Sequence, residues 1–171
     1  SAKVSNLKVV SGSPAVFEKY EVQFEVQTSA TSLDMPYTAN PPAGVQAGAG
    51  ITVNGLFSND GWKTTITQPG FLYQPYQHTA SGDKDHFVPT GKPVFAVRFA
   101  PKAAGAWQYR LSIQDAQGSV TYPATNQSAL TFNVGATSGN AYVSRGFLGV
   151  SQNDSRYFQF SNGAPFVGVG F

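Results

Sequence analysis

The chain has no cysteine, few charged residues and no long apolar run. Without cysteine, its 171 residues cannot form disulfides, thiol nucleophiles or cysteine-ligated zinc sites. Charged residues make up 12%, and the formal net charge of +2 comes from scattered Lys and Arg rather than a basic run. We therefore expect neither nucleic acid nor an acidic membrane surface as a partner. No stretch approaches the roughly 18 apolar residues of a membrane span.

Turn formers and aromatic residues are abundant. The chain holds 18 glycines and 11 prolines, and aromatics reach 13%. This composition favours an all-β domain over a helical one. The segment "YEVQFEVQT" shows the expected period of two, because Val22, Phe24 and Val26 should face a core while Glu21 and Glu25 should face water.

The same alternation recurs in segments separated by Gly- and Pro-containing turns, and no segment shows a capped helical period. Trp107 should lie in the core because it shares one strand face with Leu111 and Ile113. The pattern predicts an antiparallel β-sandwich, immunoglobulin-like or jelly-roll-like, with a C-terminal β-hairpin. The four further alternating segments are "ITVNGLF", "VFAVRFA", "WQYRLSI" and "ALTFNV".

Two segments interrupt the strand pattern, and a third marks a boundary. Met35–Gly50 is a Pro/Gly/Ala-rich loop, and Tyr73–Pro93 is predicted to be a long irregular excursion. Such loops are often functional. Small polar residues near 135–144 separate the expected sandwich, residues 1–136, from a linker and hairpin, residues 137–171.

Several short motifs occur in a fixed order along the chain. "PGFLY" begins at Pro69, "RFAP" at Arg98 and "GAWQY" at Gly105, and the chain closes on "RYFQFSNGAPFVGVGF". In this order the motifs resemble the β-sandwich domain of unknown function found ahead of the catalytic barrel in many bacterial glycoside hydrolases. The resemblance covers most of the chain from about Tyr20 onward. Leu72 departs from it, because an aromatic residue is usual at that position.

The resemblance implies a secreted or periplasmic bacterial protein and a non-catalytic accessory domain. Tyr157–Phe166 would form a hairpin, and Val167–Phe171 would begin the first strand of a (β/α)8 barrel. The acid/base and the nucleophile of such enzymes lie in the barrel, so no catalytic residue carries over. The resemblance leaves two roles open: carbohydrate binding, or structural packing against the barrel without sugar binding.

The residues themselves give little support to catalysis. Glycoside hydrolysis needs two carboxyl groups facing one sugar bond, and Glu21 and Glu25 are better explained as solvated or ion-paired surface groups. His78 and His86 are the only histidines, and no Gly-x-Ser-x-Gly elbow accompanies them. We expect this chain not to be an enzyme.

Carbohydrate binding requires exposed rings near amides, because a sugar stacks its C–H face on an aromatic ring while its hydroxyls form hydrogen bonds. Trp62 follows the turn Asn59-Asp60-Gly61. The segment "FLYQPYQH" interleaves rings with glutamines and supplies Tyr73, Gln74, Tyr76 and His78. The alternative is that Tyr73 packs under the long loop and Trp62 caps the sandwich.

The segment "GDKDHF" places two carboxylates two residues apart. Asp83 and Asp85 could help to hold a structural Ca²⁺, which prefers six to eight oxygen ligands. The other ligands of an EF-hand-type loop are absent, so a polar turn with two solvated aspartates is the competing interpretation.

Overall fold

A computed structural model describes residues 1–168 as an all-β protein. One short 3-10 helix, η1 (Val143–Arg145), accompanies the strands in this part of the chain. The strands are β1 (Lys3–Val9), β2 (Tyr20–Gln27), β3 (Thr52–Ser58), β4 (Ile66–Tyr73), β5 (Tyr76–Ser81), β6 (Lys84–Pro89), β7 (Val94–Phe99), β8 (Gly105–Asp115), β9 (Gly118–Tyr122), β10 (Leu130–Val134), β11 (Leu148–Val150) and β12 (Phe158–Phe160).

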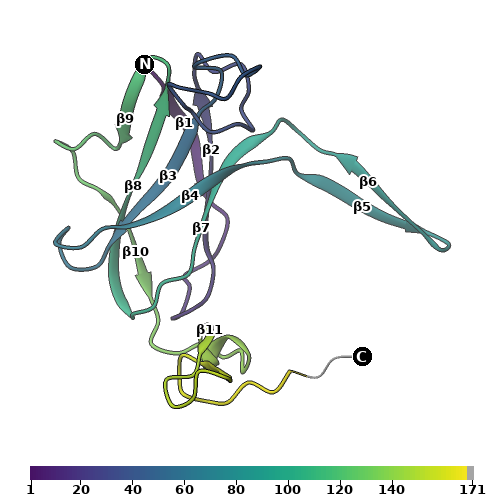
Figure 1. Ribbon diagram of the computed structural model, residues 1–171, viewed down its shortest axis with the longest axis vertical. Coiled ribbons are helices and arrows are strands. Elements are labelled where there is room, and N and C mark those ends of the chain that lie inside the picture. Colours follow the sequence, from purple (N-terminus) through teal and green to yellow (C-terminus); the bar gives the residue numbers. More distant parts are fainter. Residues whose placement is uncertain (169–171) are drawn as a thin grey trace.

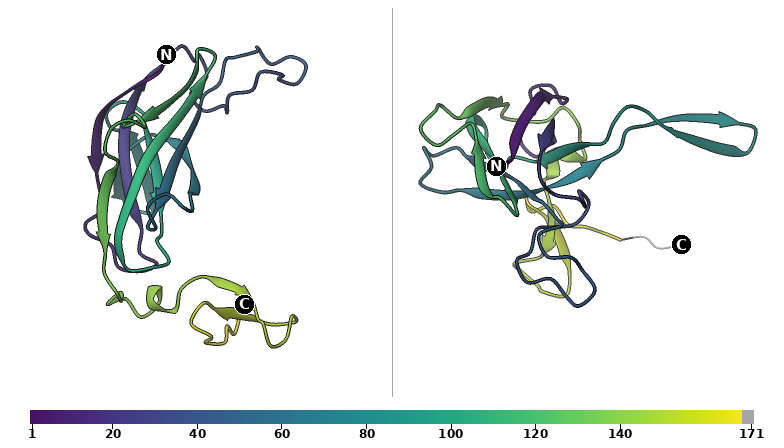
Figure 2. Two further views of the ribbon diagram at one scale, coloured as in Figure 1. Left: turned by 90° about the vertical axis from the view of Figure 1, so that its left-hand side faces the viewer. Right: turned by 90° about the horizontal axis from the view of Figure 1, so that it is seen from above.

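The main sheet has the order β1-β2-β7-β4-β3-β8-β10, with β9 added to β8. All of its pairings are antiparallel. The sheet curls so that β1, β2 and β7 form one layer and β3, β8, β9 and β10 form the other (Figure 1; Figure 2, left). This arrangement confirms the predicted all-β, sandwich-like fold.

Strand β4 belongs to both layers. Its first half pairs with β3 up to Pro69, and its second half pairs with β7 from Gly70 onward. A Cβ at Gly70 would lie 3.0 Å from Val53 Cγ1 and 3.2 Å from the Ala96 carbonyl oxygen. A side chain here would push its neighbours apart by a few tenths of an ångström, so glycine is favoured where the strand changes layers.

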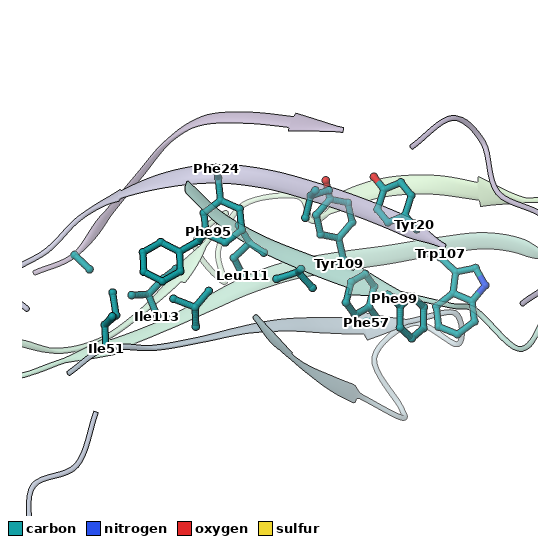
Figure 3. Packing of buried hydrophobic residues seen from close by; sticks show 14 of the residues in the cluster. Tyr20, Phe24, Ile51, Phe57, Phe95, Phe99, Trp107, Tyr109, Leu111 and Ile113 are labelled. Carbon is teal, nitrogen blue, oxygen red and sulfur yellow. The ribbon is translucent and has the colours of Figure 1, made fainter. Parts of the chain in front are cut away.

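The core lies between the layers and is rich in aromatic rings (Figure 3). Trp107 is 2% exposed and donates its indole N–H to the Ala103 carbonyl at 2.9 Å, as a buried tryptophan should. Phe57 stacks on Phe99 with ring centroids 4.0 Å apart. The alternating positions predicted to face inward are buried or partly buried, which confirms the period-two prediction.

The prediction that Glu21 faces water is wrong, whereas its interpretation as an ion-paired group is confirmed. Glu21 lies on the outer face of the sheet, but its side chain is only 4% exposed. Lys19, Gln23 and Arg98 cover the carboxylate and donate hydrogen bonds of 2.7, 2.9 and 2.7 Å to it. Glu21 is thus ion-paired but not solvated, because long polar neighbours fold over it.

The second wrong prediction concerns Tyr73–Pro93. This segment is a regular hairpin rather than an irregular loop, because β5 and β6 pair over six residues each around the turn at Gly82. The hairpin, called the arm below, projects away from the sandwich (Figure 1; Figure 2, right). Every residue of β5 and β6 is exposed. The other interrupting segment, Met35–Gly50, contains only turns and irregular backbone, as expected.

Residues 136–168 form a small unit at one end of the sandwich, called the C-terminal piece below (Figure 1). Strands β11 and β12 pair, and a turn at Ser161–Gly163 brings Phe166 N–H to the Phe158 carbonyl at 3.1 Å. The expected hairpin over Tyr157–Phe166 is thus present. The prediction that a barrel strand begins at Val167–Phe171 falls largely on residues 169–171, which lie outside the described part of the chain.

Candidate functional site

The predicted sugar-contact residues fall into two groups at opposite ends of β4. Trp62 lies in the β3–β4 turn, whereas Tyr73, Gln74, Tyr76 and His78 lie at the end of β4 and in the arm. β4 makes seven steps between its ends, or about 23 Å at roughly 3.3 Å per residue. The structure therefore does not bring Trp62 together with the other four residues.

Trp62 is held in an unusual backbone conformation. Its φ of 67° is in the left-handed region, which is costly for a bulky residue. The buried Ser58 hydroxyl accepts a hydrogen bond from the Trp62 N–H at 2.9 Å and donates one to Asp60 Oδ1 at 2.8 Å. The same carboxylate oxygen accepts the Thr64 N–H at 3.0 Å. These bonds fix the turn and therefore the position of the indole.

The negative charge of Asp60 helps to hold the β3–β4 turn in place. Hydrogen bonds from the backbone and side chain of Thr64 and from Ser58 lower the pKa of the Asp60 carboxyl to about 2. The carboxylate is therefore ionised at neutral and mildly acidic pH. An ionised acceptor forms stronger hydrogen bonds than a neutral one, so the turn is kept rigid across that range.

Arg110 lies beneath the indole and is also fixed. Its guanidinium carbon is 5.7 Å from the Trp62 ring centroid. Its Nη atoms donate to the carbonyl oxygens of Pro123, Ala124 and Gln127 at 2.7, 2.7 and 2.6 Å. The arginine thus ties the segment after β9 to the outer face of β8.

A cleft of about 330 Å³ opens beside the indole. Trp62 and Leu56 supply apolar surface, and Arg110 and three threonines supply polar groups. One ring beside three threonines and a guanidinium offers both kinds of contact that a pyranose needs. The cleft is lined by Leu56, Trp62, Thr65, Arg110, Thr121 and Thr125.

A second cleft, of about 360 Å³, lies in the corner where β4 leaves β3. Its walls include Leu33, Met35 and Pro36, and its polar side chains are Asp34, Thr52 and Asn54. The Phe71 ring also lines this corner, but none of the residues predicted for sugar contact does.

Tyr73 and Gln74 are both engaged by the protein itself. Arg98 places its guanidinium carbon 4.9 Å from the Phe71 ring centroid and 5.7 Å from that of Tyr73, which is half-buried. Gln74 donates its side-chain amide to the carbonyl of Pro75 at 3.0 Å, and the carbonyls of Thr90 and Gly91 lie at 3.5 and 3.4 Å. The Gln74 side chain therefore links the two strands of the arm at its base.

Tyr76 and His78 lie on the arm and are exposed. The His78 ring stacks on Phe87 with centroids 4.9 Å apart, and His78 Nε2 is 2.7 Å from Asp85 Oδ1. Phe87, 63% exposed, is a candidate contact that the sequence reasoning missed. The pairing of His78 with Phe87 could be inferred only by predicting this hairpin and its register.

The two aspartates proposed for calcium lie near the tip of the arm. Asp83 is in the turn, and Asp85 is paired with His78. Within residues 1–168, no three His, Cys, Asp or Glu side chains are grouped so that they could hold a metal ion. Calcium binding at Asp83 and Asp85 stays a prediction.

Comparisons of the chain with family models, curated proteins and solved structures found no match. Among the described residues, no helix is long and apolar enough to cross a membrane.

Proposed function

We propose that this chain is a non-catalytic carbohydrate-binding domain and that the cleft at Trp62 is its main sugar-binding site. The observation that carries the proposal is the strained β3–β4 turn, which holds a half-buried indole beside a largely apolar cleft lined by three threonines and Arg110. Backbone strain of this kind persists where the surrounding structure enforces it, and it concentrates at functional sites.

The chemistry of the cleft favours a neutral sugar. A pyranose would stack its C–H face on Trp62, and its hydroxyls would face Thr65, Thr121 and Thr125. Three N–H groups of Arg110 already bond carbonyl oxygens, so few of its donors remain to hold an anion.

The motif order described above extends the proposal to the parent protein. Its resemblance to the accessory domains of bacterial glycoside hydrolases suggests a secreted or periplasmic enzyme with a (β/α)8 catalytic barrel. In such an enzyme, tethering to a polysaccharide would raise the effective substrate concentration for the barrel. The low charge and the lack of cysteine are compatible with that setting.

The test is affinity electrophoresis of the chain in gels containing hydroxyethylcellulose, xylan, galactomannan, alginate or agarose. We expect retardation by at least one neutral polymer and a Kd at least about tenfold weaker for Trp62→Ala, which corresponds to ~1.4 kcal/mol. Tyr142→Ala, which removes an 82% exposed ring from the C-terminal piece, is the matched control and should behave like the wild type. Wild-type migration unchanged by every polymer would refute the proposal.

A second candidate function is structural packing against the catalytic barrel, and the C-terminal piece favours it. Large apolar side chains are exposed there at a density that the sandwich does not show. Patches of this kind mark protein–protein contacts. The exposed residues are Tyr142, Phe147, Leu148, Val150, Tyr157, Phe158, Phe166 and Val167.

Amide hydrogen exchange distinguishes this second function. If the C-terminal piece packs against a barrel, amides in 147–160 should exchange more slowly in the intact parent enzyme than in this chain alone. Equal exchange in both proteins would exclude the packing role. The two candidate functions use different surfaces, so a positive result for one does not depend on the other.

A further inference from the structure

The arm has one aromatic face and one polar face. Residues opposite each other in an antiparallel pair share a face, and successive residues alternate. The pairs Tyr76↔Pro89 and His78↔Phe87 therefore lie on one face, which we call the aromatic face. Asp85, opposite Ala80, continues this face towards the tip. The other face carries Gln77, Thr79, Ser81, Lys84, His86 and Val88.

The aromatic face is strongly exposed. Tyr76 is 55% and Phe87 63% exposed, and the His78 side chain is 52% exposed. The arm stands clear of the sandwich (Figure 1; Figure 2, right). A two-stranded hairpin is marginally stable by itself in water. A ligand laid along the aromatic face would cover these rings and stabilise the arm.

The composition of this face favours a saccharide over a protein partner. Its apolar groups are rings, a proline and Ala80, and Val88, the one larger aliphatic side chain of the arm, points to the other face. Hydrogen-bonding groups lie among the rings: the Tyr76 hydroxyl, the His78 imidazole and the Asp85 carboxylate. The C-terminal piece, by contrast, mixes rings with Leu148 and Val150, as a protein interface does.

We propose that the aromatic face of the arm is a second saccharide site, so that the domain binds polysaccharide at two separate points. This inference rests on the proposed carbohydrate-binding function. β4 separates the two sites by about 23 Å at roughly 3.3 Å per residue, and the arm extends the separation further. One short oligosaccharide therefore cannot reach both sites, whereas a long polymer can occupy both or be cross-linked by them.

The experiment is calorimetric titration with trisaccharides prepared from the polymer that retards the wild-type chain, in parallel with affinity electrophoresis in that polymer. We expect two trisaccharides per wild-type chain and one for either Trp62→Ala or the double variant Tyr76→Ala/Phe87→Ala. Each variant should bind the polymer at least about tenfold more weakly, because it loses avidity. Thr79→Ala/His86→Ala alters the polar face and should keep two sites.

The outcomes separate the two proposals. One site that only Trp62→Ala removes overturns the second site and leaves the main one standing. One site that only the arm variant removes overturns both two-point binding and the assignment to Trp62. An arm variant that keeps sugar binding but changes self-association in sedimentation makes the arm a protein contact and overturns the inference. Circular dichroism should show the arm variants folded, because the substituted arm residues are exposed.

Discussion

At the residue scale, two positions are expected to be sensitive to substitution. Gly70 permits β4 to cross from one layer to the other, and Glu21 ties three polar neighbours across the outer face of β2 and β7. The first is a steric requirement and the second an electrostatic one. Each can be tested by a single substitution.

Replacement of Gly70 by alanine should destabilise the fold. The new Cβ would lie 3.0 Å from Val53 Cγ1 and 3.1 and 3.2 Å from the carbonyl oxygens of Val53 and Ala96, and the backbone atoms cannot easily move away. We expect a loss of about 1–3 kcal/mol in the free energy of unfolding. Urea denaturation measures it. Gly12→Ala, where the added Cβ meets nothing within 4 Å, is the control, and an equal loss in both variants would contradict the steric explanation.

Glu21 makes stability depend on acid pH. Burial would raise the pKa of its carboxyl, but hydrogen bonds from Lys19, Arg98 and Gln23 and the charge of Arg98 outweigh it and lower the pKa from 4.5 to about 2. Because the folded pKa is the lower one, the ionised carboxylate stabilises the protein fully above pH 4.5, and this contribution is lost as the pH falls towards 2.

Glu21→Gln should therefore lower the free energy of unfolding at pH 7 by about 1–2 kcal/mol. The difference between variant and wild type should shrink steadily between pH 4.5 and pH 2, where the wild-type carboxyl becomes protonated. Urea denaturation at a series of pH values in this window is the measurement. A difference independent of pH would mean that the ion pairs do not contribute.

At the scale of the element, the arm depends on its base. The Gln74 amide bonds the Pro75 carbonyl and lies near those of Thr90 and Gly91, and Thr90 N–H donates to the Pro75 carbonyl at 2.8 Å. Gln74→Ala removes the side-chain hydrogen bonds at this base and leaves the backbone bond from Thr90 to Pro75. We expect faster hydrogen exchange at amides in 76–89 with the melting temperature of the sandwich unchanged. Gln77→Ala, on the exposed arm itself, should leave exchange as in the wild type.

The elements also show what the sequence could and could not reveal. β2, β3, β7, β8 and β10 were predictable because one face of each is apolar at every second residue. The arm was missed because both faces of β5 and β6 contact water, so no alternation marks a core. Exposed strands are recognisable only from their pairing, which a single sequence does not specify.

The same limit applies to the site. The turn signal Asn59-Asp60-Gly61 correctly placed Trp62 at a loop edge, but Arg110 and Thr121 reach it from strands more than 45 positions along the chain. Only the folded sheet brings them together. The burial of Glu21 was missed for a similar reason, because its cover comes partly from Arg98 on another strand.

At the scale of the whole molecule, three surfaces are arranged around one sandwich. The Trp62 cleft and the arm lie at opposite ends of β4, and the C-terminal piece lies below both layers (Figure 1). Phe147 joins the C-terminal piece to the sandwich through an edge contact with Phe17, with centroids 5.3 Å apart. The sandwich thus holds these three surfaces apart from one another (Figure 1).

The two tryptophans allow the main site to be tested directly. Trp107 is sealed in the core with its indole N–H on the Ala103 carbonyl, whereas Trp62 borders the cleft. The two indole N–H groups can be followed by nuclear magnetic resonance during titration with an oligosaccharide from the polymer that retards the protein. The Trp107 signal then serves as the internal reference for the Trp62 signal. We predict that the Trp62 signal shifts in proportion to occupancy while the Trp107 signal stays in place. Binding of the sugar without movement of the Trp62 signal would contradict a sugar site at this cleft.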